Sequence, residues 1–183
     1  MKTKMNTRKL VVLAMLTAIS AVMVFLVHFP IFPAAPFLEY DPADVPILIS
    51  TFAFGPVSGL LVTVAVSLIQ AITVSSVSGW IGAVMHIIAT GSFVLIAGNI
   101  YKRKHTMVGA IISLVIGAIT MVAVMAGLNL VLTPLYMGVS AKDVMGMLLP
   151  IIIPFNALKA GINAVVTFIL YKAIHKIILK FVD

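Results

Sequence analysis

The sequence contains no cysteine and very little charge. Only 9% of its 183 residues are Asp, Glu, Lys or Arg, and five residues are acidic. Without cysteine the chain has no disulfide, no thiolate nucleophile and no cysteine-based metal site. A soluble domain carries about 25% charged residues. The scarcity of charge therefore excludes an ordinary soluble protein.

Recognisable catalytic motifs are also missing. The sequence has no G-x-x-x-x-G-K-S/T, H-E-x-x-H or G-x-S-x-G pattern, the spacings that hold phosphate, zinc or a serine nucleophile. Its four histidines lie too far apart in the sequence to indicate a metal site. We therefore expect no enzyme, no bound metal and no cofactor. The net charge of +7 would suggest a nucleic-acid partner in a soluble protein. In this apolar chain, the positions of the basic residues are more informative than their sum, because they indicate the orientation in a membrane.

Hydrophobic residues make up 62% of the chain, and the mean hydropathy is +1.24. These values indicate an all-α integral membrane protein. We predict one membrane domain over residues 1–183, a bundle of six transmembrane helices. Gly55-Pro56 separates the second and third helices, although one long kinked helix would also fit, and Pro134 is expected to end the fifth. The predicted helices are 8–28, 44–55, 57–74, 80–101, 107–132 and 150–175.

The positive charges predict the orientation of this bundle. Ten of the twelve Lys and Arg residues lie in three clusters, within residues 2–9, 102–104 and 172–180. The positive-inside rule places these clusters, and both termini, in the cytoplasm of a cell with a multi-pass protein in its membrane. The first apolar run, 10–27, could also be read as a secretory signal. Its length, and the prolines where a cleavage site would lie, favour a membrane helix.

Residues 29–43 form the first outer segment. It holds four of the nine prolines and several aromatic residues. No Lys or Arg occurs between Lys9 and Lys102, so the segment belongs outside. Its composition predicts a packed loop that acts as a lid.

The last predicted helix carries a polar stripe. At about 100° per residue, Asn156, Lys159 and Asn163 fall on one face of an otherwise apolar helix. A lysine inside such a segment costs at least about 2.5–3.5 kcal/mol on insertion scales. Lys159 should therefore face a partner or a polar cavity. The alternative is a lysine that snorkels to the membrane surface.

Helical rise brings the other intramembrane polar groups to a similar height. Gln70, His86, Asn129, Asn156 and Lys159 should all lie in the outer half of the bilayer, beneath the lid. Any one of them could simply make an interhelical hydrogen bond. Together they predict a polar pocket that opens to the outside. A small chain with such a pocket and no energy source is typical of a capture subunit.

A smooth stripe runs along the first helix. Ala14, Ala18 and Ala21 recur at i, i+4 and i+7, a spacing that lets another helix approach closely. The stripe could pack inside the bundle or contact another membrane protein.

Five motifs resemble one known family. They are A-M-L-T-A-I-S-A (14–21), E-Y-D-P-A-D-V-P (39–46), F-G-P-V-S-G (54–59), L-N-L-V-L around Asn129, and P-F-N-A-L-K (154–159). Over nearly its whole length the chain resembles the substrate-binding S components of energy-coupling-factor (ECF) vitamin transporters, and most closely their riboflavin-specific group.

The resemblance implies a six-helix bundle in a bacterial cell membrane that binds riboflavin from outside. It also implies partners, a transmembrane coupling protein (EcfT) and two ATP-binding cassette ATPases, which would contact the small residues of the first helix. The residues implied as ligand contacts are Asn129, Asn156 and Lys159, with Leu38, Glu39, Tyr40 and Asp41 as the cover. Gln70 and His86 suit the ribityl hydroxyls, although family members can have an amide where this chain has His86. Aromatic walls for the flavin ring could come from Phe37, Tyr40, Trp80 or Tyr136.

Three alternative functions remain open at this point. The same bundle could bind a different vitamin or a flavin analogue. A membrane enzyme could use Asp41, Asp44 or His86, although no catalytic spacing supports it. A structural subunit without a small ligand would tolerate substitutions at Asn156 and Lys159.

Overall fold

The computed structural model describes residues 7–73 and 79–180, with 174–180 described by their backbone alone. The connection between the predicted helices 57–74 and 80–101 lies mostly outside the described residues. Within them, the chain folds as a helical bundle with one short antiparallel hairpin, in which Phe29 pairs with Tyr40. The elements are α1 (Thr7–Leu26), β1 (Phe29–Pro30), β2 (Glu39–Tyr40), α2 (Asp44–Phe54), α3 (Pro56–Ile72), α4 (Gly79–Arg103), α5 (Met107–Met137), α6 (Ala141–Met147), a π-helical turn η1 (Leu148–Ile152) and α7 (Ile153–Lys180).

Helices of two length classes build the bundle. In the described part of the chain, four helical segments are long and apolar enough to cross a membrane: α1, α4, α5 and the continuous run Ala141–Ala173. Two further apolar helices, α2 and α3, are shorter, at 11 and 17 residues. In the described part of the chain, α2 is enclosed by other helices, whereas α3 keeps an exposed apolar face that includes Val57, Leu61 and Ile72.

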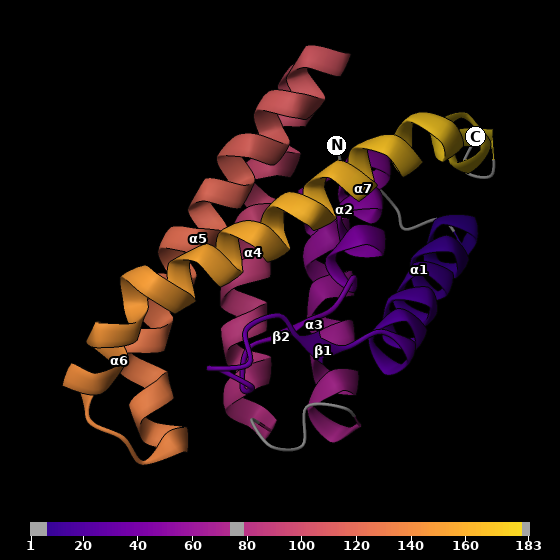
Figure 1. The fold of residues 1–183 in the computed structure, drawn as a ribbon. Helices are drawn as coiled ribbons and strands as arrows, with labels where there is room; N and C mark the ends of the chain where they lie inside the picture. Colours follow the sequence, from indigo (N-terminus) through magenta and orange to yellow (C-terminus); the bar gives the residue numbers. More distant parts are fainter. Residues whose placement is uncertain (1–6, 74–78, 181–183) are drawn as a thin grey trace.

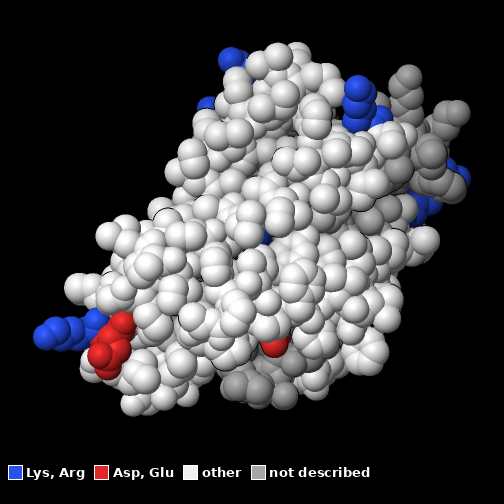
Figure 2. All heavy atoms as spheres, viewed as in Figure 1, with Lys and Arg blue, Asp and Glu red and all other residues white. Residues whose placement is uncertain are grey.

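The long axis of the bundle has two distinct ends (Figure 1). The upper end in that view carries the start of α1, the α2–α3 turn, the α4–α5 connection and the end of α7. The lower end carries the β1–β2 hairpin and α6. Figure 2 shows basic side chains mainly around the upper part of the molecule, with one basic and acidic group beside each other over α6.

Local sequence explains the turn between α2 and α3. Gly55 has φ 91°, a left-handed conformation that favours glycine, and Pro56 occupies the first turn of α3, where its missing N–H costs nothing. Beyond the turn, Gly98 on α4 lies so close that an added Cβ would be 2.8 Å from Pro56. Small residues therefore allow α2, α3 and α4 to pack tightly.

The end of α5 differs from the prediction. Pro134 does not end the helix, which continues to Met137. A membrane helix tolerates proline where its neighbours compensate for the lost hydrogen bond. Termination comes instead from Gly138, which has φ 68° and donates its N–H to the Pro134 carbonyl at 3.0 Å.

The connection between the predicted helices 107–132 and 150–175 contains a helix of its own. Ser140 and Asp143 form a capping box that starts α6. The π-helical turn η1 follows and includes Pro150, so that α7 begins at Ile153 rather than at the predicted residue 150.

Among the described residues, three clusters of buried apolar side chains fill the interior, and the smallest, Leu16, Val45 and Ile49, joins α1 to α2. The largest one fills the upper and central bundle, with Phe93, Leu48 and Val66 among its fully buried members. At the upper end, Phe52 packs against Tyr101 in a tilted arrangement and against Tyr171 edge to face, with ring centroids 4.5 and 5.3 Å away. The second cluster joins the lid to α6, η1 and the start of α7, and its buried members are Ala35, Leu38, Tyr40, Val144, Ile152 and Phe155.

Candidate ligand-binding site

A cavity lies between the lid and the lower halves of α3, α4, α5 and α7. It measures about 150 Å³, about ten times the smallest space that holds one water molecule. Eight of the ten predicted ligand-binding residues line it: Leu38, Glu39, Asp41, Gln70, His86, Asn129, Asn156 and Lys159. Residues from four helices and the lid, distant in sequence, are thus brought together.

Two buried amides in this cavity have an unused hydrogen-bonding atom. Asn156 is 1% exposed; its Nδ2 donates to the Ile152 carbonyl at 2.8 Å, and its Oδ1 has no partner among the described residues. Gln70 is 8% exposed, and its Nε2 likewise has no partner there. Leaving a buried polar atom unpaired costs about 1–3 kcal/mol. The cavity therefore offers one acceptor and one donor that a ligand could satisfy.

Asn129 is held in place by its own helix. Its Nδ2 donates to the Met125 carbonyl at 2.8 Å, and its Oδ1 accepts from Thr133 at 2.9 Å. A carboxamide carries two N–H groups, so one amide hydrogen of Asn129 is left for a ligand. Because Asn129 is 1% exposed, this donor has a fixed direction.

Lys159 is paired with the lid. Its Nζ donates to Asp41 Oδ2 at 2.6 Å, and the two side chains are 11% and 14% exposed. The ammonium group therefore points into the protein and does not snorkel. An ammonium has three N–H groups, so Lys159 retains donors for a ligand while it ties the lid to α7.

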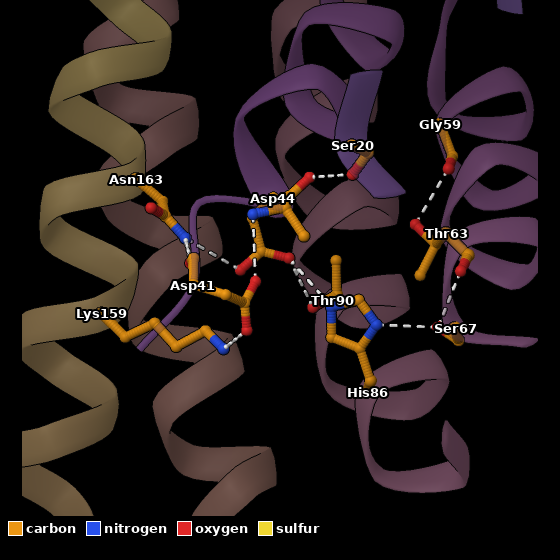
Figure 3. A network of polar contacts seen from close by, with 11 residues as sticks. Ser20, Asp41, Asp44, Gly59, Thr63, Ser67, His86, Thr90, Lys159 and Asn163 are labelled. Atoms are coloured by element: carbon orange, nitrogen blue, oxygen red, sulfur yellow. Dashed lines mark hydrogen bonds and ion pairs between the residues drawn. The ribbon is translucent and has the colours of Figure 1, made fainter. Parts of the chain in front are cut away.

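A second set of polar contacts, centred on Asp44, lies next to this ion pair (Figure 3). Asp44, at the start of α2, is fully buried and is hydrogen-bonded through Oδ1 to His86 Nε2 at 3.1 Å and to Thr90 Oγ1 at 3.0 Å. The other ring nitrogen of His86 is 2.7 Å from Ser67 Oγ. These bonds hold the His86 ring at the wall of the cavity.

Two predicted site residues lie elsewhere. Trp80 is 65% exposed and is absent from the cavity lining, as is common for an aromatic residue at a membrane interface. Tyr40 also lies outside the lining, and its hydroxyl donates to Asn163 Oδ1 at 3.1 Å. The aromatic residues that do line the cavity include Phe37 and Tyr136, whose ring centroids are 6.5 Å apart.

The structure adds polar residues that the predicted site lacked. Asp44 was considered only as a helix start or an enzyme group, and Asn163 only as part of the α7 stripe. Both are fully buried, which is rare for a carboxylate such as Asp44 unless it is paired. The sequence does carry a signal for both residues, because each is a polar residue among apolar neighbours in a predicted membrane helix. Such a residue is expected to face the protein interior rather than lipid.

The alanines of α1 are divided between two environments. Ala14 and Ala18 are exposed, and Ala21 is half-buried. The buried face of α1 is formed instead by Leu13, Leu16, Ser20 and Val24. The stripe is therefore not the surface by which α1 packs on the rest of this chain.

The fold and the cavity define a helical membrane protein that binds a small molecule. The chain belongs to the family of ECF transporter substrate-specific components, whose model matches residues 8–171. Members of this family are transporter components and not enzymes.

Named relatives and a solved structure agree with this assignment. The riboflavin transporter RibU of Staphylococcus aureus (strain TCH60) is 36% identical over 173 residues, with 91% of this chain and 90% of RibU covered. The riboflavin transporter FmnP of Bacillus subtilis (strain 168) is 32% identical, with 91% and 92% covered. A solved S component of a bacterial ECF transporter superposes with a TM-score of 0.80 at 34% identity, with 92% of this chain and 96% of that chain covered.

Proposed function

We propose that this chain is the high-affinity riboflavin-binding subunit of an ECF-type uptake transporter. The observation that carries the proposal is the unpaired Oδ1 of Asn156, in a cavity that also presents donors from Asn129 and Lys159. The pyrimidine edge of the flavin ring offers a carbonyl, an N–H and a second carbonyl in a row. One acceptor between donors complements that edge. The names of the relatives support the same vitamin.

The remaining lining suits the other parts of riboflavin. Phe37, Tyr136 and Phe155 supply apolar surface for the ring faces. Gln70 has an unpaired donor that suits a ribityl hydroxyl. Both ring nitrogens of His86 are already bonded to Asp44 and Ser67, so His86 contributes the wall of the cavity rather than a free donor. Glu39 at the lid edge also lines the cavity. These assignments place the ring toward α5 and α7 and the ribityl chain toward α3 and α4.

The proposed orientation places the upper end of Figure 1 in the cytoplasm. The basic residues Lys102 and Arg103 end α4 there, and Arg8 and Lys9 begin α1 there. The positive-inside rule then puts both termini inside and the lid outside. In this arrangement α1, α2, α3, α4, α5 and α7 make six crossings, with the short α2 enclosed by the other helices and α3 presenting one apolar face outward.

The expected result of a first binding experiment is a yellow protein. Detergent-purified protein should show the flavin absorption band, and the stripped form should quench riboflavin fluorescence stoichiometrically in a titration. A colourless preparation that leaves riboflavin fluorescence unchanged would contradict the choice of vitamin. Titration with thiamine, folate and biotin would then test the same bundle for a different ligand.

The exposed alanines of α1 are proposed to contact the coupling module, which in this family comprises EcfT and two ATPases. Ala14 and Ala18 allow a partner helix to approach closely. An Ala14→Leu/Ala18→Leu variant should lose most of its co-purification with the module while it binds riboflavin normally. The matched control is Ala123→Leu, at an exposed alanine of α5. Equal co-purification of both variants would place the contact elsewhere.

A further inference from the structure

Asn163 is a buried amide that forms hydrogen bonds with the lid but does not line the cavity. It is fully buried and lies one turn beyond Lys159 on α7. Its Oδ1 accepts from the Tyr40 hydroxyl at 3.1 Å, and its Nδ2 donates to the Asp41 carbonyl at 3.2 Å. Tyr40 and Asp41 are consecutive residues of the lid, so one side chain of α7 holds the lid at two adjacent points. Figure 3 shows the contact of Asn163 with Asp41.

Asp44 fixes the orientation of this amide. Its Oδ2 accepts from Asn163 Nδ2 at 3.3 Å, while its Oδ1 is bonded to His86 and Thr90. A buried carboxylate needs such donors, because an unpaired one is strongly unfavourable. Nδ2 of Asn163 therefore points toward Asp44 and the Asp41 carbonyl, which leaves Oδ1 directed at Tyr40.

Burial also fixes the role of Tyr40. Its ring packs in the cluster between the lid and α7, and Phe29 lies 5.5 Å away between ring centroids. Burial raises the pKa of Tyr40, so its hydroxyl stays protonated and donates to Asn163 throughout the ordinary pH range. A further bond holds the same stretch from the other side, since Ser20 Oγ of α1 donates to the Ala43 carbonyl at 2.6 Å.

The lid thus has two kinds of polar attachment. The Lys159–Asp41 ion pair lines the cavity, where a ligand can contact it. Tyr40, Asn163 and Asp44 lie outside the lining, where a ligand cannot reach them. Contacts of the second kind persist whatever the ligand does to the first.

We propose that Asn163 is a positioning residue that latches the lid over the occupied cavity, with Asp44 holding the Asn163 amide in the required orientation. The latch sets how long a bound ligand stays and makes no contact with it. The identity of the ligand rests on the proposed function, whereas the latch itself does not.

The first test of the latch needs no ligand and uses the labelling of a single introduced cysteine. The natural chain has no cysteine, and Ala35 in the lid is fully buried in the cluster shared with α7. In an Ala35→Cys protein, the rate of thiol labelling reports how often the lid lifts. Adding Asn163→Leu should raise that rate about tenfold or more in the absence of any ligand. The matched control is Asn99→Leu, at an exposed asparagine of α4 that bonds only its own helix at the Leu95 carbonyl.

Kinetics of the bound state give the second readout. Tyr40→Phe removes only the hydroxyl and keeps the ring, so it should speed riboflavin dissociation about three- to tenfold with an unchanged flavin spectrum. In the Asn163→Leu background the same change should have no further effect, because the shared bond is already gone. Unchanged labelling and dissociation rates would overturn the latch. Accelerated labelling in a protein that binds no riboflavin would keep the latch and reject only the proposed ligand.

Discussion

Replacing Asn156 by alanine is expected to weaken riboflavin binding severely while leaving the ligand-free protein as stable as before. Among the buried side-chain atoms of the described residues that line the cavity, the Oδ1 of Asn156 is the one acceptor without a partner. In the complex, its removal leaves the flavin N–H buried and unpaired, which costs about 1–3 kcal/mol, or roughly 5- to 150-fold in Kd. Fluorescence titration measures this loss.

The stability part of this prediction follows from the same atom. In the ligand-free protein the unpaired Oδ1 is itself unfavourable, so its deletion offsets the loss of the Nδ2 bond to Ile152. The melting temperature of ligand-free Asn156→Ala should therefore stay close to that of the unaltered protein. Asn99→Ala is the matched control, an exposed asparagine with the same type of bond to its own helix. Parallel loss of stability and affinity at Asn156 would indicate a purely structural role.

Lys159→Met should damage both stability and binding, for separable reasons. The substitution leaves the Asp41 carboxylate, which is 14% exposed, without its cation. Breaking a buried ion pair from one side typically costs about 3–5 kcal/mol. Thermal unfolding in detergent should show this as a clear drop in melting temperature.

A double variant separates the two effects. In Lys159→Met/Asp41→Asn the orphaned charge is removed, so most of the stability should return. Riboflavin affinity should stay low, because the ammonium donor that faces the cavity is still missing. Recovery of affinity along with stability would show that Lys159 acts only by holding the lid.

Much of the site could be predicted because each contributing residue is polar within an apolar helix. Gln70, His86, Asn129 and Asn156 stand out against their neighbours, and a constant rise per residue sets their heights. The cavity brings all four together with Lys159. Helix periodicity thus carries real three-dimensional information when a membrane fixes the direction of each helix.

Partnerships between side chains were harder to predict. The Lys159–Asp41 pair joins residues 118 positions apart, and no local pattern encodes which acid meets which base. Ser67 and Thr90 gave no signal, because hydroxyl residues are common in membrane helices and usually bond the preceding turn, as Ser67 does at the Thr63 carbonyl. Trp80 was assigned by residue type alone, and its position at the start of α4 leaves it 65% exposed.

The predicted helix boundaries differ from the structure where they rest on a proline. Pro134 lies inside α5, and Pro150 lies inside a π-helical turn. A better signal was the pair Ser140 and Asp143, three residues apart, which forms the capping box of α6. That box marks a helix start within a stretch that composition alone indicates to be a connection.

The packed upper half of the bundle limits how cargo can leave. Phe52, Tyr101 and Tyr171 close that end with packed rings, and Phe93 and Val94 fill the space between them and the cavity. A molecule as large as a vitamin could travel straight through only if α2, α4 and α7 separated and this core were hydrated. In the described part of the chain, a packed core therefore separates the cavity from the upper end, and any passage in that direction requires these helices to part.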